Sequence, residues 1–334
     1  MSPNKWIRSG CLAIVALLVL SGGSLAKNVV VDIMIDFNSP AAPTSDQLTQ
    51  VFNSMNALTN VIQTKGLNAT IFASSDTATY PALKLFVTNL GSKPNYELAL
   101  HGKSNGEKLS TMTYSQQLDL LTAAQKNINS CHICGGVVVA VKGFMPQSLD
   151  QNNDTFKALE SLGFLYDAGF KSGILYLPGH MNDTMPYPIA GYNLYAVPIS
   201  SYNMSGKMIS LSDKDAQDDS VTGPDWYNIL KTSFDEAAIN GNPIVVLINN
   251  TVSGSGDYLD AFSNFIGYAD SNNADFVTTL DLVNMTESGH PVLKAANPSA
   301  CPTCGQTNES GVKLKINATV THSQNCTNCN AVTG

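Results

Sequence analysis

The chain has 334 residues, 18 basic and 26 acidic side chains, and a formal net charge of −8. Its only arginine is Arg8, so it lacks the basic face and the arginine contacts that nucleic-acid-binding proteins use. We therefore exclude nucleic acid as a partner, together with any mechanism that needs a bidentate arginine.

Residues 1–26 have the pattern of a secretory signal peptide. Lys5 and Arg8 precede an apolar run from Cys11 to Leu20, and small residues follow up to Ala26. The apolar run is short for a membrane span, and an uncleaved anchor is the alternative interpretation. Cleavage would leave 16 basic and 26 acidic residues, a net charge of −10. We expect an exported protein, secreted or at the cell surface, with no membrane span after cleavage.

From residue 29 onward, segments typical of strands and helices alternate. Capping boxes at Thr44–Gln47 and Thr113–Gln116 each predict the start of a helix. Residues 171–222 are expected to be irregular apart from one strand. Strands are predicted at 29–36, 69–73, 96–101, 137–141, near 164–166, 193–198, 243–249 and 275–279. Helices are predicted at 44–61, 82–90, 114–129, 154–162, 224–238, 257–269 and briefly after 279.

This alternation predicts an α/β fold with a parallel sheet and outer helices, either a barrel or an open sheet. We expect one domain over residues 27–286, a linker over 287–300 and a small Cys-rich tail over 301–334. The tail carries one alternating strand, at 312–320, and is too short to form a core without cross-links.

Six cysteines remain after the signal peptide, and they form three Cys-x-x-Cys pairs. An even number of cysteines in an exported protein favours disulfides. The two pairs of the tail also have the spacing of a structural zinc site, so both interpretations stay open. The tail could also join the chain to a protein partner at the cell surface. The pairs are Cys131 with Cys134, Cys301 with Cys304, and Cys326 with Cys329.

Nine Asn-x-Ser/Thr sequons follow the signal peptide, which makes N-glycosylation at several of them an expectation for an exported protein. They begin at Asn68, Asn153, Asn182, Asn203, Asn249, Asn284, Asn308, Asn317 and Asn325.

Polar side chains follow four of the predicted strands at their carboxyl ends. In a parallel barrel these ends share one face, so the side chains are expected to converge on one pocket. The groups are Asp36 with Asn38, His101 with Asn105, the loop from Lys142 to Gln147, and Asn249.

In this order the segments resemble the motifs of the polysaccharide deacetylase family, also called the NodB-homology domain or carbohydrate esterase family 4. The resemblance spans about residues 28–284. It implies a distorted (β/α) barrel and metal-dependent hydrolysis of the C–N bond of N-acetyl sugars. The matching segments are Ile35-Asp36-Phe37-Asn38, His101 with Asn105, Gly143-Phe-Met-Pro-Gln147 before a helix ending in Leu162-Gly-Phe164, Leu165-Tyr-Asp-Ala-Gly-Phe170, and Leu247-Ile-Asn249.

The same resemblance assigns roles to individual residues. It makes Asp36 the catalytic base and His101 a ligand of a zinc-like divalent metal. Gln147 belongs to the substrate pocket, and so do Asn38, Asn105 and Asn249. Asn38 or Phe37 takes the position of a metal-binding acid, Asn105 that of the second histidine, and Asn249 that of the histidine in the last motif.

The departures from the family pattern weaken the chemistry that the resemblance implies. A neutral amide is a poor zinc ligand and does not titrate as a general acid. Met145 also replaces the arginine that would bond to the base. We therefore expect an exported, deacetylase-like protein that binds carbohydrate and whose catalysis is weakened or lost. The alternative is an active metal-dependent deacetylase with an unusual ligand set, which would recruit Asp183, close to His180, from residues 171–222.

Overall fold

The computed structural model describes residues 27–36, 43–134 and 137–288. Within these ranges no helix is both long and apolar enough to cross a membrane. The linker beyond Ser288, the Cys-rich tail, the signal peptide and Asn38 lie outside the described residues.

The centre of the molecule is a nine-stranded sheet in the order β12-β1-β2-β3-β6-β7-β9-β8, with β13 paired to the start of β1. All neighbours are parallel except β8 and β9. The strands are β1 (Asn28–Ile35), β2 (Ala69–Ala73), β3 (Tyr96–Leu100), β6 (Gly143–Phe144), β7 (Tyr166–Lys171), β8 (Tyr187–Pro188), β9 (Tyr195–Ile199), β12 (Ile244–Asn249) and β13 (Asp275–Val277).

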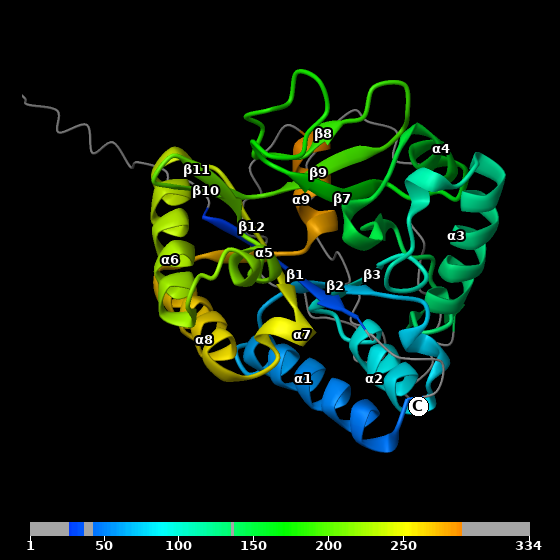
Figure 1. Cartoon of the computed structure of the whole chain (residues 1–334), viewed down its shortest axis with the longest axis horizontal. Helices are drawn as coiled ribbons and strands as arrows, with labels where there is room; N and C mark the ends of the chain where they lie inside the picture. Colours follow the sequence, from blue (N-terminus) through cyan, green and yellow to red (C-terminus); the bar gives the residue numbers. More distant parts are fainter. Residues whose placement is uncertain (1–26, 37–42, 135–136, 289–334) are drawn as a thin grey trace, which may run out of the picture.

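Helices surround this sheet, with α1 and α2 on one side, α3 and α4 on a second, and α6 and α8 on a third (Figure 1). Both predicted capping boxes are confirmed at α1 and α3, where Thr44 and Thr113 cap the first turn. The helices are α1 (Ser45–Gln63), α2 (Pro81–Gly91), α3 (Tyr114–Asn129), α4 (Asn153–Ser161), α5 (Asp213–Asp218), α6 (Gly223–Asn240), α7 (Asn250–Ser253), α8 (Gly256–Ser271) and α9 (Thr279–Ser288).

The sheet curls so that the segments after β9 and β11 approach β12 at its other side. The backbone N of Ser200, just after β9, donates to Val245 O of β12 at 3.0 Å. The backbone N of Leu247 in β12 donates to the carbonyl oxygen of Leu211, just after β11, at 2.9 Å. These few hydrogen bonds give the sheet the form of a distorted barrel without a continuous ladder that would close it. The predicted α/β fold with a parallel sheet and outer helices is confirmed.

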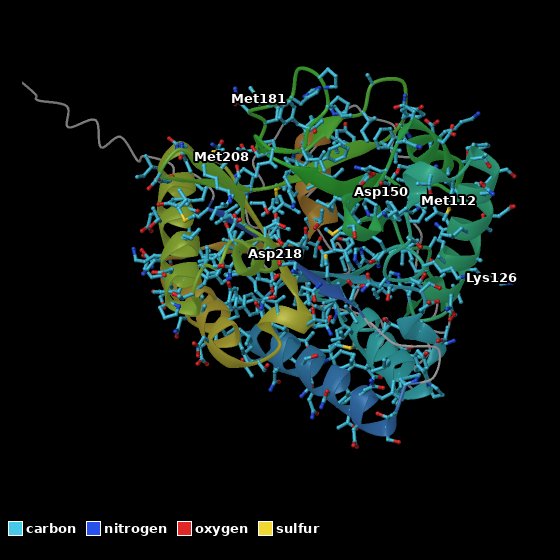
Figure 2. All side chains as sticks on the ribbon, in the orientation of Figure 1. Met112, Lys126, Asp150, Met181, Met208 and Asp218 are labelled. Atoms are coloured by element: carbon cyan, nitrogen blue, oxygen red, sulfur yellow. The ribbon has the colours of Figure 1, made fainter. Side chains whose placement is uncertain are left out.

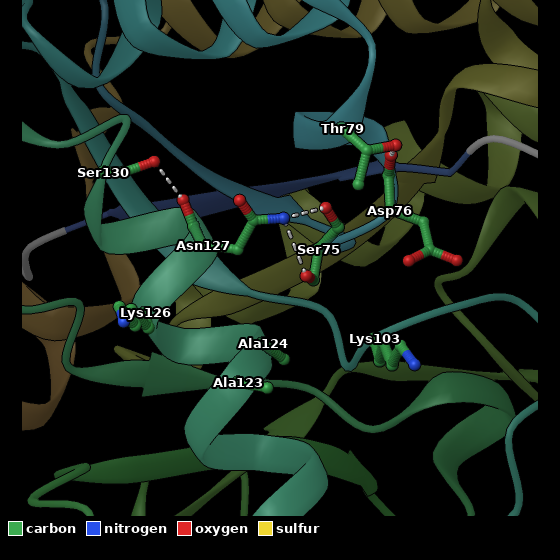
Figure 3. Close-up of a pocket in the computed structure, with 9 residues that line it drawn as sticks. All are labelled: Ser75, Asp76, Thr79, Lys103, Ala123, Ala124, Lys126, Asn127 and Ser130. Atoms are coloured by element: carbon green, nitrogen blue, oxygen red, sulfur yellow. Dashed lines mark hydrogen bonds between the residues drawn. The ribbon is translucent and has the colours of Figure 1, made fainter.

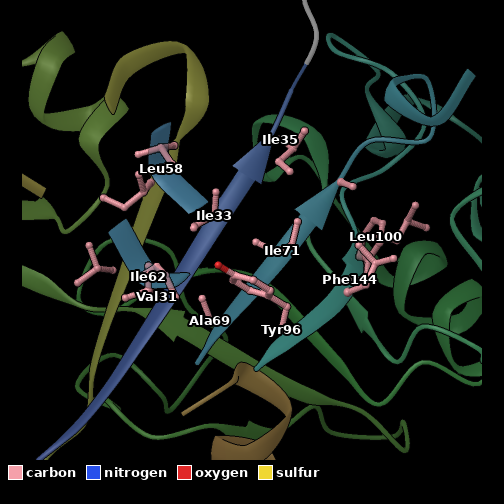
Figure 4. Close-up of a cluster of buried hydrophobic side chains, with 14 of the residues drawn as sticks. Val31, Ile33, Ile35, Leu58, Ile62, Ala69, Ile71, Tyr96, Leu100 and Phe144 are labelled. Atoms are coloured by element: carbon pink, nitrogen blue, oxygen red, sulfur yellow. The ribbon is translucent and has the colours of Figure 1, made fainter. Parts of the chain in front are cut away.

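The main core lies between the strands and the surrounding helices. Because successive side chains of a strand point to opposite faces, alternate residues of β1 point outward. They are Val29, Val31, Ile33 and Ile35, and they pack in one buried cluster with Leu58 and Ile62 of α1 (Figure 4). Equivalent residues of the next strands extend this cluster under α2 and α3 and hold the strand ends in place. These are Ala69, Ile71, Tyr96, Leu98 and Leu100.

A layer of polar side chains lies buried on the other face of the strands, and we call it the carboxyl network. Thr279 Oγ1 donates to Asp32 Oδ1 at 2.6 Å. Glu97 accepts from Tyr166 OH at 2.7 Å and from Thr70 Oγ1 at 3.1 Å. Asp32 Oδ2 has no hydrogen-bond partner within the described residues. The one acidic side chain inside β1, Asp32, is therefore fully buried among polar groups and not exposed to solvent.

Three predicted elements are wrong. Residues 137–141 do not form a barrel strand, because Val137–Val138 (β5) pairs locally with Ile133–Cys134 (β4) and the barrel uses β6 instead. The strand near 164–166 begins at Tyr166 and continues to Lys171. Residues 171–222 hold more regular structure than expected, because an antiparallel hairpin of β10 (Ser201–Met204) and β11 (Lys207–Ser210) and the short helix α5 follow β9.

The loops of this region form one rim of the molecule, where Met181 and Met208 lie exposed (Figure 2). At the other end of the domain, α9 reaches Ser288, two residues beyond the predicted boundary at residue 286.

Candidate functional site

Four of the predicted site residues meet at the carboxyl end of the barrel. Asp36 follows β1 and His101 follows β3, while Gln147 opens the short helix η3 (Gln147–Leu149) after β6. Asn249 is the last residue of β12. All four side chains are buried, and they come from parallel strands whose carboxyl ends face the same way.

Asp36 is the centre of the hydrogen bonds that join these residues. Gln147 Nε2 donates to Asp36 Oδ1 at 3.1 Å and to the His101 carbonyl oxygen at 2.8 Å. His101 Nε2 lies 3.4 Å from Asp36 Oδ2, within ion-pair distance. His101 Nδ1 donates to the Met145 carbonyl oxygen at 3.0 Å, since a carbonyl can only accept. The backbone carbonyl of Met145 thus orients the imidazole of His101, and Met145 is the residue that replaces the arginine of the family pattern.

Both ionisable groups are held in their charged forms. Burial alone would raise the pKa of Asp36, but the charge of His101 and the amide groups of Gln147 and Asn249 lower it below its usual value. Burial alone would lower the pKa of His101, but the charge of Asp36 raises it, helped by the hydrogen bond to the Met145 carbonyl and by Glu107. The two residues form a buried carboxylate–imidazolium pair.

Asn249 acts as a hydrogen-bond donor toward Asp36. Its Oδ1 accepts from the backbone N of Thr251 at 2.8 Å and from Thr251 Oγ1 at 2.6 Å. This leaves the amide nitrogen for the Asp36 carboxylate. The sequon Asn249-Asn-Thr251 is therefore occupied by internal bonds at a buried position, which disfavours a glycan there.

Two residues of the site escaped the sequence analysis. The buried Asn250 accepts from the backbone N of Asp36 through Oδ1 at 2.9 Å. Glu107 accepts from the backbone N of Lys103 at 2.9 Å and shapes the loop after His101. Gly102 permits this loop, because its φ is +59° and an added Cβ would lie 2.1 Å from Glu107 Oε1. The only sequence signal was their position next to Asn249 and His101.

Two other residues singled out in the sequence have different settings. Asn105 is exposed in the turn after β3. Met145 is fully buried, and its side chain packs in an apolar cluster with Phe72 and Tyr166. The place of Asn105 in a substrate pocket therefore stays a prediction, and Met145 brings no charge to the site.

The structure describes only part of the cysteine set. Cys131 is buried and has a free thiol. Cys134 is described only as part of β4. Disulfides and zinc therefore both remain predictions for the tail. Its four cysteines lie outside the described residues, and they are Cys301, Cys304, Cys326 and Cys329.

His180 and Asp183, the pair predicted for the alternative ligand set, contact each other. His180 Nδ1 lies 2.6 Å from Asp183 Oδ2, and the His180 ring stacks on Tyr187 with centroids 4.0 Å apart. Both residues belong to the loop between β7 and β8 and are partly exposed.

The described residues do not complete a catalytic zinc site. His101 has the orientation of a ligand, because its Nδ1 is bonded to a carbonyl and its buried Nε2 has no hydrogen-bond partner among the described residues. Among the described residues Asp36 is paired with it and Glu107 acts on it by charge, but these groups are not gathered into the set of three protein ligands that catalytic zinc sites use. Among the described residues no three His, Cys, Asp or Glu side chains are grouped to hold a metal.

Comparisons with known proteins identify the fold. No protein-family model and no curated protein matches the chain. A solved structure described as a probable polysaccharide deacetylase from Pseudomonas aeruginosa PAO1 is similar with a TM-score of 0.62, over 80% of this chain and 94% of that one, at 14% identity.

Two further solved structures are similar over the same extent. A protein from Mycobacterium smegmatis assigned as a polysaccharide deacetylase has a TM-score of 0.60 at 17% identity, over 82% of this chain and 96% of that one. Puue allantoinase also has a TM-score of 0.60, at 15% identity, over 81% of this chain and 94% of that one. Since an allantoinase shares the architecture, the fold alone does not define a substrate. The chain has the fold of the polysaccharide deacetylases.

Proposed function

We propose that this chain is an exported carbohydrate-binding protein of the deacetylase fold that has lost most or all of its hydrolytic activity. The observation that carries the proposal is the closed arrangement around Asp36. Its carboxylate is paired with His101, accepts from Gln147 and lies close enough to the Asn249 amide for that group to lower its pKa, so three protein groups already compete for its lone pairs. A general base must instead accept a proton from the attacking water.

The second candidate is an active metal-dependent deacetylase, and one observation favours it. The Nε2 atom of His101 is buried without a hydrogen-bond partner among the described residues, and Nδ1 is bonded to a backbone carbonyl, which is the ring orientation of metal-binding histidines. With a single imidazole and a carboxylate that is already bonded, this site falls short of the usual three ligands. We therefore place it second.

Export is supported by the predicted signal peptide and by the distribution of the sequons. Four of them are exposed on the domain, at Asn153, Asn182, Asn203 and Asn284. The Asn68 side chain instead donates to the Phe276 carbonyl oxygen at 3.0 Å, which keeps its amide engaged.

Replacing His101 with alanine is expected to leave the zinc content of the protein unchanged. The full mature chain, the His101→Ala variant and a matched His180→Ala variant would be compared by elemental analysis after extensive dialysis. Any zinc in the Cys-rich tail is common to all three samples, so only the difference matters. Loss of one zinc per chain in His101→Ala alone would overturn the proposal in favour of the metal-dependent enzyme.

The mature protein is expected to bind an N-acetylglucosamine tetramer without releasing acetate faster than a protein-free control. Calorimetry would measure binding, and an acetate assay of the same mixture, with and without added zinc, would measure hydrolysis. Acetate release that disappears in His101→Ala would support the second candidate. Absence of binding to this and to other neutral or acidic oligosaccharides would contradict the carbohydrate-binding proposal itself.

A further inference from the structure

A cavity of about 470 Å³ lies beside the candidate site, between α3 and the short helix η1 (Thr77–Thr79) (Figure 3). Its volume lies within the range of about 300–1,000 Å³ that is usual for small-molecule sites. Ser75, Asp76 and Thr79 line one wall, while Lys126 and Asn127 of α3 line the other. Lys103, from the loop after β3, closes one end.

The cavity is joined directly to the loop that follows His101. The backbone N of Ser75 donates to Gly102 O at 3.1 Å, and the backbone N of Asp76 donates to Lys103 O at 2.9 Å. Asn127 Nδ2 fixes the opposite wall by donating to Ser75 O at 2.8 Å and to Ser75 Oγ at 3.1 Å. Hydrogen bonds therefore fix the walls of the cavity, and it lies at the same end of the barrel as Asp36.

The charged groups of this cavity are not paired with the protein. Most lysines of the described residues form an ion pair, a hydrogen bond or a cation–π contact, and Lys65, Lys171 and Lys231 are examples. Lys103 and Lys126 form none of these within the described part of the chain, and the Asp76 carboxylate forms none there either. Lys126 and Lys103, on opposite sides of the cavity, and the Asp76 carboxylate are thus charged groups of its lining without internal partners (Figure 3).

The hydrogen-bond acceptors that line the cavity indicate which kinds of ligand could bind there. Asp76 and Asn127 Oδ1 can accept from hydroxyl groups, and Thr79 Oγ1 can also accept because its proton is given to the Asp76 carbonyl oxygen. A simple anion has no proton to donate to these acceptors and would be repelled by Asp76. A ligand that carries both hydroxyl donors and carboxylates satisfies the acceptors and the ammonium groups on the two sides of the cavity.

We propose that this cavity binds an acidic saccharide chain, whose sugar rings carry carboxylates, as a subsite beside the Asp36–His101 site. The inference rests on the proposed carbohydrate binding and adds the class of glycan to it. Lys103 and Lys126, on opposite sides of the cavity, each bind a carboxylate of an acidic saccharide chain, while Asp76 and Asn127 accept from ring hydroxyls. Since the rest of the mature chain is acidic, the preference comes from these two local charges and not from the net charge.

A different role exists for Lys126, which lies in the last turn of α3 at the surface (Figure 2). A cation there stabilises the helix through its dipole. If this were the only role, Lys126→Gln would lower the melting temperature without changing ligand preference. Lys103 lies in a loop and has no such role.

The test compares a galacturonic acid trimer with its fully methyl-esterified form, a neutral ligand of almost the same shape, on the full mature protein. We expect the acid to bind about fivefold or more tightly than the ester, and Lys103→Gln or Lys126→Gln each to weaken acid binding by about fivefold while leaving the ester unchanged. Lys108→Gln, an exposed lysine of the same loop outside the cavity, is the matched control. The preference should also shrink in about 0.5 M salt, because salt screens exposed charges.

Other results would overturn the inference. Equal affinity for the acid and the ester would do so. An equal loss of affinity for the acid in Lys108→Gln would also do so, because it would show only a general electrostatic attraction to lysines of this surface. Competition by inorganic phosphate as strong as that of the trimer would show anion binding without sugar recognition. Binding of neutral oligosaccharides without any preference for the acid would refute this subsite and leave the proposed function standing, whereas no binding of any saccharide would refute both.

Discussion

Replacing Asp36 with alanine is expected to lower the free energy of unfolding by about 3–5 kcal/mol, because it removes one partner of a buried ion pair. His101 would lose its counter-charge, and Gln147 Nε2 would lose one acceptor. The conservative Asp36→Asn keeps an acceptor for Gln147 and should cost less, about 1–3 kcal/mol. Urea unfolding of the three proteins at neutral pH measures both differences.

Comparing the free energies of unfolding of Asp36→Ala and Asp36→Asn separates the contribution of the negative charge from that of the hydrogen bonds to the side chain. A loss below about 1 kcal/mol in Asp36→Ala would mean that the pair contributes little and that water replaces it. Equal losses in alanine and asparagine would show that the negative charge, and not the hydrogen bonds from Gln147, stabilises this end of the barrel.

The stability of the domain is expected to fall as the pH rises from about 4 to about 8. Burial raises the pKa of Asp32 from 3.8 to about 8 and that of Glu97 from 4.5 to about 7. A carboxyl group with a raised pKa keeps its proton in the folded protein at a pH where the unfolded chain has released it. The folded state then binds more protons, so this contribution is complete below the unfolded pKa and is lost as the pH approaches the folded pKa.

Asp32→Asn and Glu97→Gln remove these titrations while keeping the side-chain shapes. Each variant should reduce the loss of stability by up to about 1.4 kcal/mol per pH unit. Some slope should remain, since burial also raises the pKa of Asp167 to about 8 and that of Asp213 to about 7. Denaturant unfolding at several pH values measures the slope. An unchanged slope in both variants, or an equal change in the exposed control Asp119→Asn, would contradict the prediction.

The elements that sequence could predict are those with local signals. The strand at 69–73 and the helix ending at 129 were placed correctly, because an apolar β-branched run and a capping box are each read from neighbouring residues. The expected strand at 137–141 failed because its apolar residues are equally suited to a local hairpin, and only the register between Leu100 and Phe144 decides which strand joins the barrel.

The residues of the candidate site also divide into those with a local sequence signal and those placed by contacts between distant residues. Sequence placed Asp36, His101, Gln147 and Asn249 at the ends of parallel strands, and the structure brings these four together. It could not show that Asn250 bonds to the Asp36 backbone, nor that Asp32 meets Thr279, because these contacts join residues 214 and 247 positions apart. Such contacts depend on how the sheet curls, and no local pattern encodes that.

The pairing of β1 has a consequence for the order in which the domain assembles. Of the described strands β1 is synthesised first, yet it pairs along one edge with β12 and at its start with β13, the last two strands of the described residues. A growing chain that ends before residue 244 therefore leaves hydrogen-bonding groups of β1 without both partners. Contacts this distant in sequence fold slowly. The barrel can close only after nearly the whole domain has been synthesised, so shortened chains should accumulate as aggregating fragments and not as smaller folded units.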